Sequence, residues 1–189
     1  MSRILYQTVE DRDNPDEVEL NGPYICRNNK AWFGHGYYFW DTFICLAHWW
    51  GNLCYQKNGY IICQSSLPEE NMCKVYDLVG HPELLQEIET ASKIITKGTG
   101  QNEILHIPEI IEYLKRKTSF LSKYGAIRAY PLDTLPEEMS KEYKIKFNNR
   151  NRAFIDLRPA IQFCFFDKSL LNGDYHIVYP ETYCNEMVM

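Results

Sequence analysis

The order in which strand-like and helix-like segments follow one another constrains the fold of this chain more than any other feature. Two long segments in the middle, 81–97 and 107–124, repeat apolar residues at i, i+3 and i+4 and have a proline near the first turn, as amphipathic helices do. Short strings rich in β-branched and aromatic residues, typical of strands, lie on both sides of them. The strand-like strings are residues 4–9, 36–40, 59–67, 125–131, 152–157, 159–167 and 175–180. This pattern predicts an α+β domain.

Two further helices are predicted nearer the amino terminus. Asn14 and Pro15 suit the start of the first, which Gly22 is placed to end. Asp41 suits the N-cap of the second, which continues through Trp50.

The composition is that of an ordinary globular chain. With 189 residues, 45 % of them hydrophobic, the chain is long enough to bury a core without disulfides or metal ions. No low-complexity segment or Ser/Gly linker divides it. We therefore expect a single domain over residues 1–189, with the helical segment 81–124 inserted between strands of its sheet.

Cysteine usage and hydropathy favour a cytoplasmic protein. The seven cysteines are an odd number, with no C-x-x-C pair and no histidine at ligand spacing, which favours reduced, buried thiols and no bound metal. The amino-terminal segment lacks the apolar run of a signal peptide, and no apolar run reaches the ~18 residues that a membrane span needs. We expect a soluble protein with no membrane partner, and the sequence leaves its oligomeric state open.

The charge distribution argues against one class of partner. A net charge of −5 does not favour bulk attraction to nucleic acid. The segment 141–152, "KEYKIKFNNRNR", is the exception, with five basic residues against one glutamate. Such a segment is either a solvated loop or a contact with a phosphate or an acidic partner.

One segment, 31–51, is unusually rich in aromatic rings. It contains all four tryptophans of the chain, and its "FGHG" turn has two glycines, Gly34 and Gly36, where the backbone can approach a ligand closely or adopt positive φ. Tyr38 follows on a predicted strand and Trp49 on a predicted helix, so we expect these rings to face each other across a slot that suits a flat aromatic ligand. We expect the remaining rings to be core: Phe33, Tyr37, Phe39, Trp40 and Trp50.

Four pieces of the sequence occur in the order found in a known family. They are "ILYQTV" (4–9), "FGHGYYFWD" (33–41), "DTFICLAHWW" (41–50) and "GYIICQSSL" (59–67). Together they resemble the ADP-ribosyltransferases, in particular the catalytic domain of the poly(ADP-ribose) polymerase type, over roughly the first third of the chain. A later string, "IQFCFFDKSLL" (161–171), resembles the strand that carries the family's catalytic glutamate. The resemblance implies a split antiparallel β-sheet core with a helical insertion in the middle.

The chemistry that the resemblance implies is the use of NAD as a substrate. The nicotinamide is expected between Tyr38 and Trp49, with its carboxamide bonded to the backbone at Thr8. Gln7 stands where the family has a histidine that bonds the ribose, and Gln162 stands where it has its glutamate. The implied catalytic positions are thus Gln7, Tyr38 and Gln162.

Further contacts with NAD are expected from the glycine turn and from the loop before it. Gly34 and Gly36 allow close backbone approach, and His35 between them is a candidate for contact with the adenosine half. Arg27, together with Lys30, is placed to neutralise the diphosphate, although exposed basic residues are more often plain surface charges.

Two neutral amides replace the ionisable groups of the family pattern. An amide can bond a ribose hydroxyl, but it cannot stabilise the cation that develops on the ribose during transfer as a carboxylate does. Asp156 and Asp174 are the carboxylates that could take over that role. Chain elongation to poly(ADP-ribose) is therefore not expected.

Three functions follow from these observations. The first is a mono-ADP-ribosyltransferase, of the kind found in bacterial effectors and toxins, which moves ADP-ribose from NAD to a protein, nucleic acid or small-molecule acceptor and releases nicotinamide. The second is a catalytically inactive nucleotide-binding module. The third is an enzyme similar to the RNA 2′-phosphotransferases, which would need the basic segment 141–152. The sequence identifies neither the acceptor nor the role of segment 81–124, which is core, a lid or a partner surface.

Overall fold

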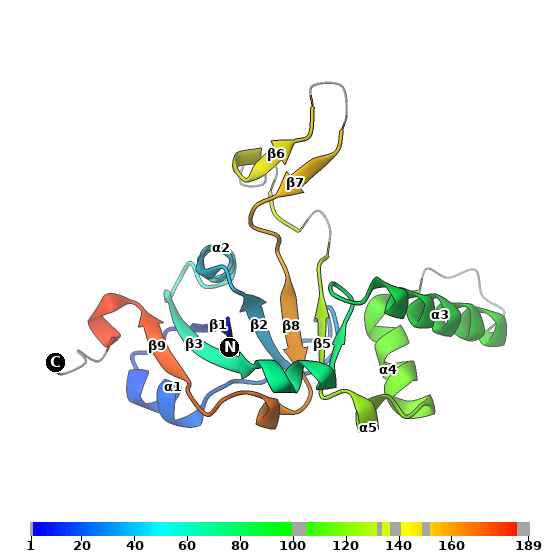
Figure 1. Ribbon diagram of the computed structural model, residues 1–189. Helices are drawn as coiled ribbons and strands as arrows, with labels where there is room; N and C mark the ends of the chain where they lie inside the picture. Colours follow the sequence, from blue (N-terminus) through cyan, green and yellow to red (C-terminus); the bar gives the residue numbers. More distant parts are fainter. Residues whose placement is uncertain (1, 100–104, 132–133, 137–140, 149–151, 185–189) are drawn as a thin grey trace.

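The protein is an α+β structure in which helices pack on both faces of a mostly antiparallel sheet (Figure 1). The computed structural model describes residues 2–99, 105–131, 134–136, 141–148 and 152–184. The strands are β1 (Ser2–Glu10), β2 (Tyr37–Asp41), β3 (Tyr60–Pro68), β4 (Val75–Asp77), β5 (Ala126–Ala129), β6 (Lys144–Lys146), β7 (Phe154–Asp156), β8 (Gln162–Phe165) and β9 (His176–Tyr179). The α-helices are α1 (Pro15–Asn21), α2 (Ile44–Cys54), α3 (Leu85–Thr99), α4 (Ile107–Lys117) and α5 (Phe120–Lys123). The short 3₁₀ helices are η1 (Glu69–Lys74), η2 (Pro82–Leu84), η3 (Lys168–Leu170) and η4 (Glu181–Tyr183).

The main sheet has the strand order β4-β5-β8-β2-β1-β3-β9. Within the described ranges, β4 and β5 are parallel and the other neighbours are antiparallel. The strands β6 and β7 form a separate hairpin that projects away from the main sheet (Figure 1). Its two connections to the body lead from β5 and into β8.

The pairing of β1 with its two neighbours is unequal. The ladder with β3 extends over all nine residues of β1. The ladder with β2 comprises two pairs, Leu5↔Asp41 and Tyr6↔Trp40. The sheet is therefore split between the second half of β1 and the first half of β2.

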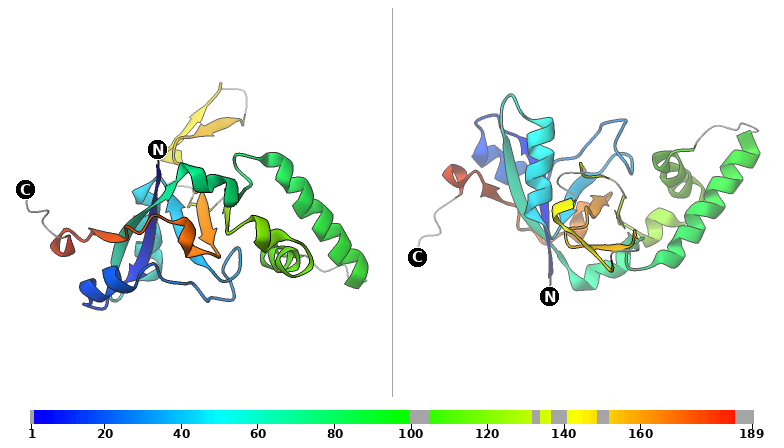
Figure 2. Two further views of the ribbon diagram at one scale, coloured as in Figure 1. Left: turned by 60° about the horizontal axis from the view of Figure 1, so that its bottom comes forward. Right: turned by 90° about the horizontal axis from the view of Figure 1, so that it is seen from above.

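Alternation along the strands divides the core between two sheet faces. The face that carries Trp40 and Cys164 packs against α2 at one end and against α3, α4 and α5 at the other. The opposite face, which carries Leu5 and Phe39, packs against α1, η1 and η3. Figure 2 shows α3, α4 and α5 grouped at the β4 end of the sheet, apart from α2.

The helical segment in the middle of the chain is confirmed. Its helices lie between β4 and β5 in the sequence and pack around buried residues such as Ile88, Ile111 and Phe120. The helix predicted over 107–124 is interrupted, because Thr118 is extended and separates α4 from α5. Within the described ranges, none of the helices combines the length and the apolar content that crossing a membrane requires.

One local prediction is wrong, one is wrong in part, and one strand was not predicted. Asp41 does not cap α2. It is the last residue of β2, and the N-cap of α2 is Phe43. The Asp41 carboxylate is instead buried in an ion pair with Arg128. The segment 141–152, which has the composition of a solvated loop, contains β6, whose lysines alternate with an apolar residue. The strand β4, only three residues long, is too short for its pattern to predict it.

The cysteines are all free, and their burial is uneven. Cys63 and Cys164 are buried, and burial raises the pKa of each thiol to about 12. Cys54 and Cys73 are exposed, so the expectation of uniformly buried thiols is wrong.

Candidate functional site

A cleft of about 560 Å³ occupies the split between β1 and β2. Its walls come from the second half of β1, the first half of β2, the loop that precedes β2, the end of α2 and the first residue of β8. Small-molecule sites in proteins typically enclose ~300–1,000 Å³. The cleft is thus large enough for a ligand of nucleotide size.

Three tryptophans line this cleft: Trp32, Trp40 and Trp50. The buried ring of Trp40 is at the centre, with ring centroids 6.3 Å from Trp32 and 6.4 Å from Trp50. Trp32 is nearly perpendicular to Trp40, with an interplanar angle of 81°. The rings form an aromatic corner, which we call the tryptophan corner.

The predicted slot between Tyr38 and Trp49 is not formed. Tyr38 lines the cleft and packs against the cluster of α4, whereas Trp49 packs beside Trp40 in the cluster of α2 and does not line the cleft. The reason lies in α2, whose buried residues include Leu46 and Ala47. Because Trp50 follows these by four and three residues, it lies on their side of the helix. Both rings are near Trp40, at 5.9 Å for Trp49 and 6.4 Å for Trp50, but only Trp50 is part of the described cleft lining. The helical spacing of Leu46, Ala47 and Trp50 is the sequence signal that could have placed Trp50 on the sheet-facing side of α2.

The side chain of Tyr38 stabilises the glycine turn. Its hydroxyl accepts a hydrogen bond from Phe33 N at 2.9 Å and donates one to Gly34 O at 2.7 Å. Its ring stacks on Phe33, with centroids 6.2 Å apart. Burial raises the pKa of the Tyr38 hydroxyl well above its ordinary value. The hydroxyl is therefore a neutral structural group in this arrangement.

Gln7 is the most fully bonded amide around the split. Its Nε2 donates to Tyr24 O at 2.9 Å and to Tyr38 O at 3.2 Å, and its Oε1 accepts from Tyr24 N and from Tyr175 Oη, both at 2.8 Å. These four bonds use the whole capacity of a primary amide. The Gln7 side chain thus closes the inner end of the split, where the backbone ladder stops.

Gln162 and Gln7 lie on opposite faces of the sheet, although both line the cleft together with Tyr38, because the sheet is split at this point. Gln162 pairs with Trp40, which pairs with Tyr6 on β1, so Gln162 shares the face of Tyr6 and Gln7 does not. Gln162 lines the cleft and is 8 % exposed. Among the described residues, no hydrogen-bond partner engages its amide. Gln162 is therefore the amide that is open to a ligand.

Thr8 and two cations also belong to the polar lining. Thr8 Oγ1 donates to Ala47 O at 2.9 Å and ties β1 to α2. Arg27 and Lys30 line the mouth of the cleft, are exposed, and form no ion pair with any carboxylate of the described residues. The described lining includes no aspartate or glutamate. The cleft is therefore locally cationic on a chain of net charge −5.

The glycine turn lies outside the cleft and acts as its support. Gly34 has a φ of +80°, a left-handed conformation that favours glycine. Gly36 exchanges backbone hydrogen bonds with Cys26, at 2.8 and 3.2 Å, and a Cβ at this position would collide with Cys164 Sγ. His35 is exposed at the turn. None of the three lines the cleft.

The two candidate substitute carboxylates are also outside the cleft lining. Asp156 accepts hydrogen bonds from Tyr130 Oη at 2.6 Å and from Arg158 N at 3.0 Å, at the base of the β6/β7 hairpin. Asp174 lies in the segment between η3 and β9.

The chain matches no protein-family model, and it has no match among curated proteins or solved structures. The function must therefore be argued from the cleft itself.

Proposed function

We propose that this protein is an ADP-ribosyltransferase-like protein that binds NAD in the cleft between β1 and β2. The observation that carries the proposal is the split sheet, whose opening holds an aromatic corner and two unpaired cations without a carboxylate. A planar ring and a diphosphate need these two kinds of surface. The sequence resemblance supplies the identity of the dinucleotide.

The proposed placement uses three groups of residues. The tryptophan corner takes an aromatic ring of the ligand, and Arg27 and Lys30 neutralise the diphosphate. The amide of Gln162 bonds a ribose hydroxyl, because it lines the cleft and no described residue uses its hydrogen-bonding capacity. Gln7 is not part of this placement, since its four hydrogen bonds are satisfied by the protein.

The reaction that the resemblance implies is mono-ADP-ribosyl transfer. The bond between nicotinamide and the anomeric carbon of the ribose breaks, nicotinamide leaves, and an acceptor nucleophile forms a bond to that carbon. A cation develops on the ribose in such a transition state. The described lining of the cleft has no carboxylate to stabilise it. This observation favours the second candidate function, a module that binds the nucleotide with little or no turnover.

Calorimetry with millimolar NAD tests the binding. We expect saturable binding that weakens by roughly tenfold or more in the double variant Arg27→Ala/Lys30→Ala, because each cation loses a charge-assisted contact with the diphosphate. The matched control is Lys57→Ala/Lys97→Ala, two exposed lysines outside the cleft. Absence of binding by the wild-type protein would overturn both candidate functions.

Release of labelled nicotinamide separates the two candidates. Release that depends on the protein supports the transferase, whereas binding without release supports the inactive module. A radiolabelled ADP-ribose then identifies the class of acceptor. Transfer to a 2′-phosphorylated RNA would favour the phosphotransferase-like enzyme over both.

A further inference from the structure

The hairpin of β6 and β7 has one entirely apolar face. Its register pairs Ile145 with Ile155, and backbone hydrogen bonds extend the pairing to Phe147 with Ala153 and to Tyr143 with Leu157. Side chains of paired residues lie on the same side of an antiparallel ribbon. The apolar face therefore consists of six side chains: Tyr143, Ile145, Phe147, Ala153, Ile155 and Leu157.

This apolar face is open to solvent. The exposed fractions are 58 % for Ile145, 65 % for Phe147, 51 % for Ile155 and 49 % for Leu157. An isolated two-stranded hairpin is marginally stable by itself, and soluble proteins rarely expose contiguous apolar patches without a use for them. A cover for this face is thus to be expected.

Charge on the hairpin is opposite to that of the body. The segment 141–158 contains six lysine or arginine residues and two carboxylates, a formal charge of +4, so the rest of the chain carries −9. Lys144 and Lys146 lie on the face opposite the apolar one, and Arg158 lies over the ring of Tyr143 at 4.1 Å. The hairpin therefore combines an apolar face with an opposite face that carries two lysines.

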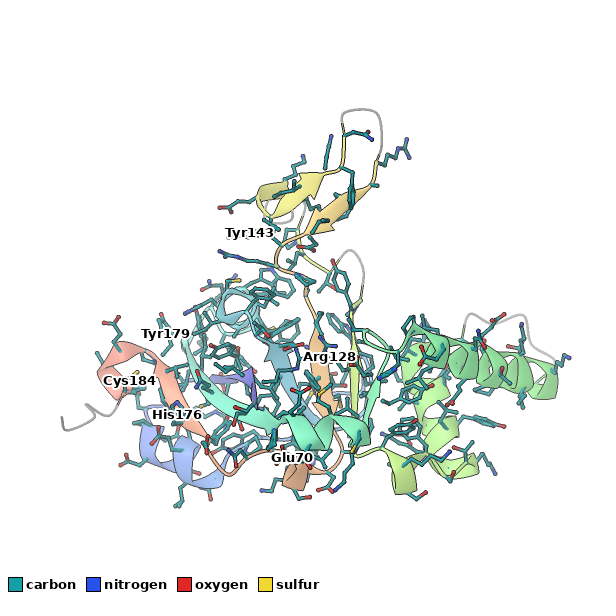
Figure 3. The ribbon with its side chains drawn as sticks, viewed as in Figure 1. Glu70, Arg128, Tyr143, His176, Tyr179 and Cys184 are labelled. Atoms are coloured by element: carbon teal, nitrogen blue, oxygen red, sulfur yellow. The ribbon has the colours of Figure 1, made fainter. Side chains whose placement is uncertain are left out.

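The outer part of the hairpin, which begins near Lys146, lies away from the acidic body (Figure 1). Figure 3 shows Tyr143 at the base of the hairpin, above the main sheet. From Tyr143 to Phe147 an extended strand covers ~13 Å, which exceeds the Debye length of ~8–10 Å in ordinary buffer. An anionic surface that meets the outer part of the hairpin is thus screened from the negative charge of the body.

We propose that the β6/β7 hairpin is a docking element for the surface of an anionic phospholipid bilayer. The apolar face lies among the first acyl carbons, and the long side chains of the lysines and arginines extend to lipid phosphates and carboxylates at the headgroup level. The insertion is shallow, because the free edges of the ribbon keep their backbone groups at the hydrated headgroup level. No spanning segment is needed, so the proposal is compatible with the hydropathy of the chain, but it departs from the expectation of no membrane partner, which rested on hydropathy alone.

The observations favour a bilayer over other anionic partners. Nucleic acid attracts the cations but does not cover the apolar face. A second copy of the hairpin covers the apolar face but brings +4 against +4. An anionic bilayer supplies an apolar layer and negative charge at adjacent depths, as the hairpin requires. This inference is independent of NAD binding.

Co-sedimentation with lipid vesicles tests the proposal. Vesicles of phosphatidylcholine with about 30 % phosphatidylserine are compared with phosphatidylcholine alone at about 0.1 M salt. We expect the full-length protein to bind the anionic vesicles and to bind the neutral ones at least about tenfold more weakly. Ile145→Ser/Phe147→Ser removes apolar contacts, and Lys144→Glu/Lys146→Glu reverses two charges; each should weaken binding by roughly tenfold or more.

Matched controls distinguish the hairpin from general surface effects. Leu20→Ser/Leu53→Ser alters side chains that are 84 % and 57 % exposed elsewhere, and Lys57→Glu/Lys97→Glu makes the same charge change elsewhere. Both controls should bind anionic vesicles like the wild type, and thermal unfolding should show that all variants are folded. Failure of the wild type to bind anionic vesicles overturns the proposal, and so does equal loss in the controls. Self-association without lipid that Ile145→Ser/Phe147→Ser abolishes overturns it in favour of a second copy. Lipid-independent binding of a labelled RNA that Lys144→Glu/Lys146→Glu abolishes overturns it in favour of nucleic acid.

Discussion

The two ends of β2 are both polar, but their charges are arranged in opposite ways. At the carboxyl end, Arg128 bonds Asp41 at 2.9 Å and both oxygens of Asp77 at 3.0 and 3.1 Å, and all three side chains are buried. At the amino end, Arg27 and Lys30 are exposed and unpaired among the described residues. Buried charges that satisfy one another fix the sheet, whereas exposed charges beside a concave site remain open to a ligand. We call the carboxyl end the structural end of β2, and the amino end, where we propose that NAD binds, the functional end.

The largest expected effect breaks the structural end. Arg128→Met leaves the carboxylates of Asp41 and Asp77 buried without their main counter-charge, and breaking such a pair costs about 3–5 kcal/mol. Chemical denaturation at neutral pH measures the loss. The control is Arg27→Met at the functional end, which should change the free energy of unfolding by less than about 0.5 kcal/mol. Similar losses in the two variants would show that the ends do not differ.

The next effect compares the two glutamines. Gln7→Leu removes four hydrogen bonds and leaves Tyr24 N and Tyr175 Oη without their acceptor, so we expect a loss of about 2–3 kcal/mol. Gln162→Leu removes an amide that no described residue bonds, and it should cost less than about 1 kcal/mol while weakening NAD binding. Denaturation and calorimetry on both variants measure these effects. A larger loss of stability in Gln162→Leu than in Gln7→Leu contradicts the assignment.

Local sequence patterns predict the elements well because they depend on neighbouring residues. The β-branched strings and the i, i+3, i+4 stripes are present where expected, and alternation correctly places Gln162 and Cys164 on one side of β8. Alternation within one strand does not predict whether a side chain on another strand lies on the same face of the sheet. The relation of Gln7 to Gln162 depends on two long-range registers, through Trp40, and no local pattern contains them.

The buried ion pairs of Arg128 with Asp41 and Asp77 also depend on long-range contacts that local patterns do not predict. Asp41 precedes a helix, and by local rules it is a good N-cap. Its actual partner, Arg128, is 87 residues away in the sequence. A buried carboxylate gains more from a guanidinium than from two backbone amides at an exposed helix end, so the tertiary contact overrides the local preference.

A smaller effect probes the support beneath the functional end. Tyr38→Phe removes the hydrogen bonds to Phe33 N and Gly34 O, and should cost about 1–2 kcal/mol at neutral pH. Because burial raises the pKa of Tyr38, the folded state keeps a proton that the unfolded state releases above the ordinary value of 10.0. The contribution of Tyr38 to stability is thus complete below that pH and is lost as the pH rises further. Denaturation between neutral and alkaline pH should show a shallower decline for Tyr38→Phe; an identical decline contradicts the buried, neutral hydroxyl.

The smallest effect is a footprint of the ligand on a thiol at the functional end. Cys54 is exposed, ends α2 and lines the cleft, and Cys73 is exposed on η1 outside the cleft. Burial of its sulfur raises the pKa of Cys54, so its alkylation at neutral pH is slow and accelerates with pH as the thiolate forms. If NAD occupies the cleft, saturating ligand covers Cys54 and slows its alkylation severalfold, while Cys73 reacts at an unchanged rate. Peptide mass spectrometry after timed exposure to iodoacetamide measures both rates in one sample. Equal slowing at Cys54 and Cys73 indicates a global effect of the ligand. If calorimetry detects binding but neither alkylation rate changes, NAD binds outside this cleft.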